Sequence, residues 1–205
     1  GTGGKNVGIG YQSLFSITSG SDNICIGHDA GHDITTATHS VAIGHEALSS
    51  VTSTAANVAI GSNAGKAVTS GYGLVYIGEN CGVEIASNAI GANALLNVTT
   101  GNHNVAMGTS AGQSITTGNG NVCIGNAAGV NRTTSSDLTA IGNSASYTAT
   151  TAGQNTSVGG AALYSNVTGD NNVAVGTNAL YLCTGASNTA VGRYANMLLT
   201  TANAN

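Results

Sequence analysis

The chain has 205 residues, of which 6% are charged and 41% are hydrophobic, and its formal net charge is −4. Four Lys and Arg residues in total cannot form a basic stripe along a phosphate backbone, which argues against nucleic-acid binding. No segment approaches the roughly 18 consecutive apolar residues of a membrane span. Disorder is also not expected, because the net charge is low and the apolar residues are periodic. The chain opens partway through a repeat, so we expect it to be a fragment of a longer protein.

One short motif, Asn-Val-Ala-Ile-Gly or a close variant, recurs twelve times, and nine of the eleven intervals equal the 17-residue step from Gly10 to Gly27. The other two intervals are shorter: a 13-residue step from Gly78 to Gly91 and a 16-residue step from Gly176 to Gly192. A fixed short period predicts a solenoid, in which each repeat forms one coil and contacts mainly its neighbours. The closing glycines are Gly10, Gly27, Gly44, Gly61, Gly78, Gly91, Gly108, Gly125, Gly142, Gly159, Gly176 and Gly192.

The three residues before each closing glycine predict a β-strand. The residue next to the glycine is aliphatic in all twelve repeats, and the residue two positions earlier is aliphatic in eight. Because side chains alternate along a strand, these two columns share one face. The column between them holds small residues, with Tyr76 as the single large exception.

The closing glycine predicts a turn that needs a positive φ or a close backbone approach. A second small column follows three residues later, and most repeats then carry an aliphatic residue before Thr-Thr-Gly or Thr-Ser-Gly. Each repeat is therefore interpreted as two short strands and two turns. The predicted fold is all-β: a parallel β-roll (a β-helix or solenoid) of about twelve 17-residue coils, forming a single repeat domain over residues 1–205.

The asparagine that opens the motif predicts a ladder of side-chain amides that bond one coil to the next. A structural role is favoured over ligand binding for this column. Its members are Asn6, Asn23, Asn57, Asn104, Asn121, Asn155, Asn172 and Asn188.

The predicted strands are apolar on both faces, and such strands are normally covered on both. One face can lie toward the interior of the coil. The other repeats in every coil as an apolar stripe that is too large to leave in water. Identical chains around a rotation axis are the economical cover, so we expect a homotrimer; a monomeric roll with a mildly apolar face is the alternative.

These repeats resemble the left-handed parallel β-roll heads of trimeric autotransporter adhesins. The longer segment 93–108 is similar to repeats of viral and phage tail-fibre proteins, and segment 172–180 fits the same pattern. The coils are longer here than in adhesin heads, by an extra turn on one side. The resemblance implies a left-handed coil, a homotrimer, and an attachment or spacer module displayed on the surface of a virion or a bacterial cell.

His28-Asp29 and His45-Glu46 stand at matching positions in adjacent repeats. Stacked imidazoles beside carboxylates could hold a metal, but no third and fourth ligand is evident, so we expect no metal site and no cofactor. Asp29 and Glu46 are also the only neighbouring carboxylates that a polysaccharide-degrading tailspike could use. A solvated turn edge explains them better, and we do not expect an enzyme.

Adjacent threonines, such as Thr99-Thr100 and Thr116-Thr117, raise a third class, an ice-binding protein. Adjacent residues of a strand face opposite sides, so only one of the two columns is expected to face outward. An ice template needs paired rows, and the preference of threonine for strands and turns is the simpler explanation.

The leading hypothesis is a structural and receptor-binding fibre or adhesin module, which attaches a virus, or second a bacterium, to a host surface through glycans. Three copies of a shallow site would raise avidity. An inert spacer shaft with the binding tip elsewhere is the alternative. The expected partners are further copies of the chain and a host glycan or protein receptor, without membrane insertion. The most variable positions supply the candidate binding residues: Tyr11, Gln12, His28, Asp29, His45, Glu46, Tyr72, Glu79, Arg193 and Tyr194.

Overall fold

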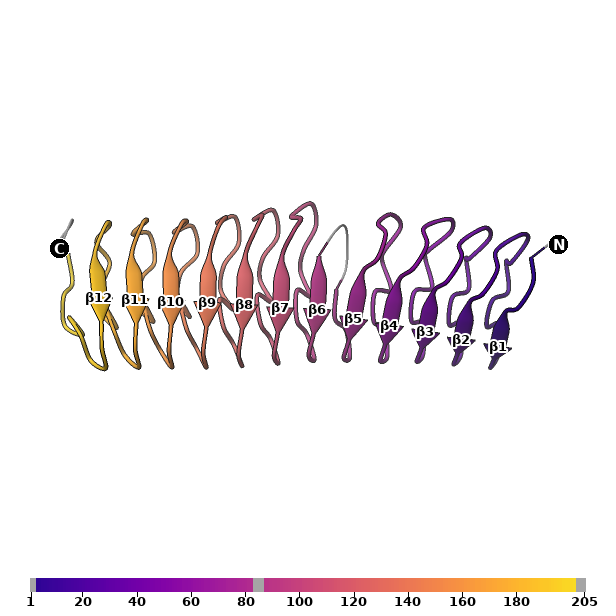
Figure 1. Ribbon diagram of the computed structural model, residues 1–205, viewed down its shortest axis with the longest axis horizontal. Coiled ribbons are helices and arrows are strands. Elements are labelled where there is room, and N and C mark those ends of the chain that lie inside the picture. Colours follow the sequence, from indigo (N-terminus) through magenta and orange to yellow (C-terminus); the bar gives the residue numbers. More distant parts are fainter. Residues whose placement is uncertain (1–2, 83–86, 202–205) are drawn as a thin grey trace. The chain divides into compact units, whose positions relative to one another are not determined.

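The computed structural model describes residues 3–82 and 87–201, and within these ranges the only regular elements are three-residue β-strands. No helix that could cross a membrane occurs in the described part of the chain. The chain divides into two compact units, residues 1–93 and 94–205. In each unit, the strands lie side by side and point the same way, with one strand in each coil (Figure 1).

The first unit contains six strands in its described residues, and each bonds in parallel to the next. The short interval between Gly78 and Gly91 does not disturb this pairing, because Ile77 still lies opposite Ile90. The interval is therefore shorter because fewer residues connect these two strands, and not because the strands are shifted. The strands are β1 (Val7–Ile9), β2 (Ile24–Ile26), β3 (Val41–Ile43), β4 (Val58–Ile60), β5 (Val75–Ile77) and β6 (Asn88–Ile90).

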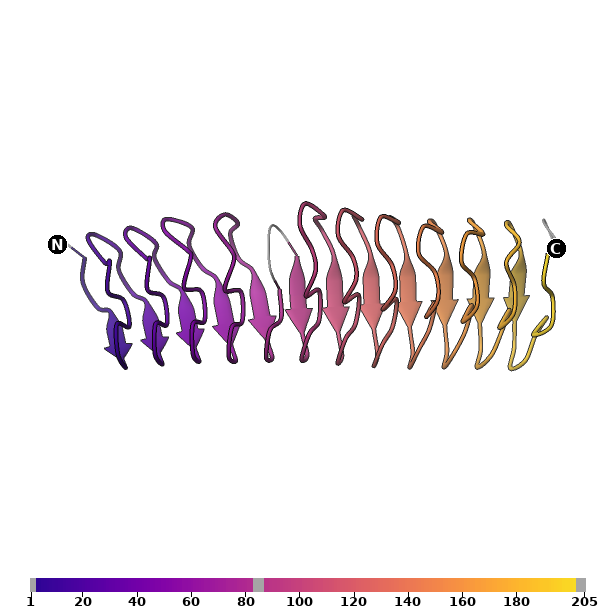
Figure 2. The ribbon, with the colours of Figure 1, turned by 180° about the vertical axis from the view of Figure 1, so that it is seen from behind.

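The second unit repeats this arrangement, and its one shorter interval also preserves the register, with Val173 opposite Thr189. Figure 2 shows the same unit from behind, with the irregular segments that connect the lower turns to the upper loops. The strands are β7 (Val105–Met107), β8 (Val122–Ile124), β9 (Thr139–Ile141), β10 (Thr156–Val158), β11 (Val173–Val175) and β12 (Thr189–Val191). The predicted all-β parallel solenoid is thus confirmed.

The prediction of two strands in each coil is wrong, because the described residues form one strand per coil. The returning segment still bonds from coil to coil, for example from the Leu48 amide to the Ala64 carbonyl at 3.0 Å. It is not a strand because left-handed residues bend it twice, at Glu46 (φ 54°) and at Leu48 (φ 48°). Leucine rarely adopts this conformation, so the sequence carries no turn signal there.

The narrow interior is filled mainly by small side chains. The middle residue of each strand from β2 to β12, such as Ala42 or Ala59, is buried, and between the terminal coils so is the small residue three positions after the glycine, such as Ala47. Aliphatic residues of the returning segment, such as Leu48 and Val51, complete the core between these columns. The four cysteines are free and buried, and burial raises the pKa of the Cys25 thiol to about 12.

The closing glycines have the conformation that the sequence predicts. Gly10 has a φ of 128°, and a Cβ built on it would lie 2.5 Å from the carbonyl oxygen of Gly27. No side chain fits between backbones that stack this closely, so the position requires glycine for both reasons.

The asparagine ladder is also confirmed. The Asn23 side-chain amide donates to the Asn6 Oδ1 at 3.1 Å, and Asn121 donates to the Asn104 Oδ1 at 3.0 Å. The same oxygens also accept backbone N–H groups of the next coil, as in the bond from the Asn23 amide to Asn6 at 3.0 Å. These buried amides therefore satisfy one another and hold the coils at a fixed spacing.

Candidate functional site

The outer face of the strands is mostly aliphatic, and its polar members are Asn88, Thr139, Thr156 and Thr189. The two outer columns of the strands stay partly in water: Ile24 is 41% exposed, Ile60 38% and Met107 42%. No Lys, Arg, Asp or Glu occurs in either column. We call this surface the aliphatic face; it consists of the first and third residues of each strand. A parallel sheet with one face in water is unusual, because such sheets are normally covered on both sides.

The turn that follows the strands of the first unit carries a column of stacked rings. The Tyr11 and His28 ring centroids lie 5.1 Å apart, and those of His28 and His45 lie 5.2 Å apart. His28 Nδ1 lies 3.0 Å from Asp29 Oδ2, and Glu46 Oε2 accepts from the Lys66 ammonium at 2.5 Å. The structure therefore brings the predicted patch together, because stacked coils place equivalent residues one coil apart.

Beside this column lies a recess of about 190 Å³, lined by Asp29, His32, Asp33, Glu46, Ser49 and Ser50. The Asp29 Oδ1 is buried and makes no hydrogen bond with the described residues. The hydrogen bond from Lys66 is the main reason that the pKa of Glu46 lies below its usual range. The three carboxylates supply the recess with hydrogen-bond acceptors, while the Ser49 and Ser50 hydroxyl groups can donate or accept, so a ligand with several hydroxyl groups suits it.

Glu46 does not suit the role of general acid in polysaccharide cleavage. That role needs a carboxyl group whose pKa is raised, whereas Lys66 lowers the pKa of Glu46. Within the described ranges, no group of three His, Cys, Asp or Glu side chains is placed to hold a metal ion.

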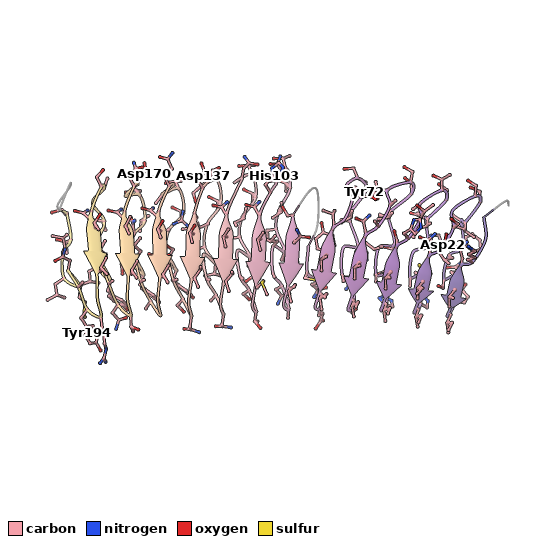
Figure 3. All side chains as sticks on the ribbon, viewed as in Figure 1. Asp22, Tyr72, His103, Asp137, Asp170 and Tyr194 are labelled. Carbon is pink, nitrogen blue, oxygen red and sulfur yellow. The ribbon has the colours of Figure 1, made fainter. Side chains whose placement is uncertain are left out.

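The remaining candidates do not line this recess. Figure 3 shows Tyr72 at the upper end of a coil, beside the loop that precedes the strand, whereas Tyr194 lies at a lower turn of the second unit. Tyr72 is 77% exposed. The Arg193 guanidinium lies 4.4 Å from the Tyr194 ring centroid and so forms its own cation–π pair. Gln12 and Glu79 occupy turn positions of the first unit, and Glu79 is exposed.

Backbone conformation accounts for part of the polar character of these turns. The second residue after the glycine is left-handed in both units, as in Gln12 (φ 51°), Asp29 (φ 56°), Asn63 (φ 56°) and Asn178 (φ 58°). Asn and Asp tolerate this region better than most residues. Turn geometry alone therefore favours polar residues here, whether or not they bind a ligand.

A second ring column, which was not predicted from the sequence, lies in the second unit. The rings of Tyr147, Tyr164 and Tyr181 stack at 5.0 Å with interplanar angles of 3° and 11°. Their spacing, which equals the repeat period, was the available signal. Because the rings stack on one another, they offer edges and hydroxyl groups to solvent rather than open faces.

Comparisons of the chain with known protein families, with curated proteins and with solved structures give no significant match.

Proposed function

We propose that the chain is a structural and receptor-binding module of a fibre or adhesin, which attaches a virus, or second a bacterium, to a host surface. The observation that supports this most is the aliphatic face, because it recurs in every coil and calls for a cover. A second copy of the chain presents columns with the same coil spacing, so the two faces match along their length. A homotrimer covers the face of each copy.

Association through the aliphatic face has a substantial driving force. Burying one aliphatic side chain completely contributes about 1.5–3 kcal/mol, so closing the exposed part of each outward residue contributes about 0.5–1 kcal/mol. The described residues provide six strands in each unit, and most of their outward residues can make this contact. The cost of association is offset when several coils engage together.

We expect the chain to run in sedimentation equilibrium as a trimer of its 19.9 kDa subunit. Ile43→Lys places a charge on the aliphatic face and should shift the mass toward the monomer. Thr36→Lys is the matched control, because Thr36 is exposed on another side of the coil. A monomeric wild type at micromolar concentration would contradict the proposed association.

The recess of the first unit is the proposed receptor site. Its carboxylates accept hydrogen bonds and donate none, and glycan hydroxyl groups are suitable donors. Such a site is shallow and weak by itself, and presentation in several copies would supply avidity.

Asp33→Asn with Glu46→Gln should reduce adsorption to host cells or to immobilised glycans, because two charge-assisted contacts are lost. Asp137→Asn is the control, since Asp137 is an exposed carboxylate outside the recess and is not a candidate binding residue. Adsorption that is equal for the wild type and both variants would favour the alternative function, an inert spacer shaft.

A further inference from the structure

The paired threonines of the second unit form a regular surface array. We use the name threonine array for Thr99, Thr100, Thr116, Thr117, Thr133, Thr134, Thr150 and Thr151. The expectation that only one column faces outward is wrong. The pairs lie on bends rather than strands; the second threonine of each pair is exposed, whereas the first is exposed at Thr99 and half-buried in the other three pairs.

The first threonine of each pair is locked to the next coil. The Thr99 hydroxyl donates to the Thr116 carbonyl at 3.1 Å, and the Thr116 hydroxyl donates to the Thr133 carbonyl at 3.0 Å. The backbone N–H groups of Thr99 and Thr100 reach the same Thr116 carbonyl, at 2.9 and 3.2 Å. Each pair therefore repeats the orientation of the previous pair, at the coil spacing of about 4.8 Å.

The second column is available to solvent. Thr100, Thr117, Thr134 and Thr151 are exposed, and no hydrogen bond of their hydroxyl groups is found among the described residues. Threonine is stiff at χ1, so methyl and hydroxyl groups can repeat along the column in fixed directions. The array contains no charged side chain that would hold a disordered hydration shell.

We propose that the threonine array binds an ordered water lattice, namely the surface of ice. The repeated hydroxyl groups anchor water through hydrogen bonds, and the methyl groups between them restrict its orientation. The first unit provides an internal comparison for the threonine array. In the first unit the equivalent pairs are Thr18-Ser19, Thr35-Thr36, Thr52-Ser53 and Thr69-Ser70, so three of the four outer positions lack the methyl group.

Slow growth of polycrystalline ice from a solution of the chain tests this inference, together with thermal hysteresis. We expect the wild type to be incorporated into ice and to depress the growth temperature below the melting point. Thr117→Lys with Thr134→Lys should abolish most of both effects, because two long charged side chains interrupt the array. Ser53→Lys with Ser70→Lys, at equivalent positions of the first unit, should leave both effects in place.

Thr117→Val with Thr134→Val keeps the shape and the methyl groups but removes the hydroxyl groups, and should weaken incorporation partly. Thermal unfolding of each variant establishes that it is folded. Exclusion of the folded wild type from ice, or equal incorporation of the wild type and the array lysine variant, would overturn the proposal. Because the array and the recess share no residue, this result is independent of the adsorption experiment.

Discussion

Tyr76→Ala is expected to destabilise the first unit by about 3–5 kcal/mol, the usual cost of removing a large aromatic side chain from a core. Tyr76 occupies the small column of β5 and is completely buried. Its ring fits because glycines stand beside it: a Cβ on Gly65 would lie 2.7 Å from Tyr76 Cδ2, and one on Gly82 would lie closer still. Urea unfolding measures the loss as a lower midpoint.

Tyr76→Phe should raise the free energy of unfolding of the first unit or leave it unchanged. The Tyr76 hydroxyl is buried and makes no hydrogen bond with the described residues, and burial raises its pKa. Removing an unsatisfied hydroxyl recovers about 1 kcal/mol. Tyr72→Phe is the control, since Tyr72 is 77% exposed. A loss of more than about 1 kcal/mol in Tyr76→Phe would show that the hydroxyl has a partner, for example a buried water.

A double-mutant cycle would test whether the glycines and the ring belong together. Gly82→Ala should be strongly destabilising in the wild type, since its methyl group overlaps the Tyr76 ring. In the Tyr76→Ala background the overlap disappears. The remaining cost of Gly82→Ala is then the left-handed conformation that alanine must adopt at residue 82 (φ 64°). This cost is roughly 1–2 kcal/mol. Additive effects of the two substitutions would contradict this account.

The features that the sequence predicts correctly are those that depend on one coil stacked on the next. The strand positions, the glycine turn and the asparagine ladder follow from the constant repeat period, because equivalent residues of stacked coils must be neighbours. The same reasoning brings His28 and His45 together. Tyr76, the single large residue of the small column, fits because Gly65 and Gly82 leave room for its ring. The sequence contains these glycines, but their position beside the ring is evident only from the structure of the coil.

The features that the sequence misses depend on the path of the chain within one coil. Leu48 and Leu163 are left-handed, a conformation that leucine does not signal, so the returning segment looks like a strand. The outward position of both threonines follows from the same bent path. The tyrosine column had a visible spacing, but each tyrosine alone resembles an ordinary variable turn residue.

Arg132→Ile is expected to stabilise the second unit, by about 1–4 kcal/mol, even though it removes hydrogen bonds. Arg132 stands where other coils carry Ile34, Val68 or Ile115, and it is completely buried. Its Nη1 donates to the Ser135 hydroxyl at 2.5 Å and also to the Ala152 carbonyl. Nε and Nη2 make no hydrogen bond with the described residues. Burial lowers the pKa of Arg132 to about 10, so the guanidinium remains charged at neutral pH.

The aliphatic residue is favoured because the free-energy cost of burying a charge without an ionic partner is larger than the stabilisation from the two hydrogen bonds. Ser135→Ala should accompany Arg132→Ile, so that no buried hydroxyl is left alone. Thermal unfolding should show a Tm higher by at least about 2 °C, which corresponds to roughly 1 kcal/mol in a domain of this size. Arg193→Ile, at an exposed turn, should leave the Tm unchanged. A lower Tm in the double variant would mean that the interior of the coil holds an anion or water that pairs with the guanidinium, and that the charge contributes to the stability of this unit.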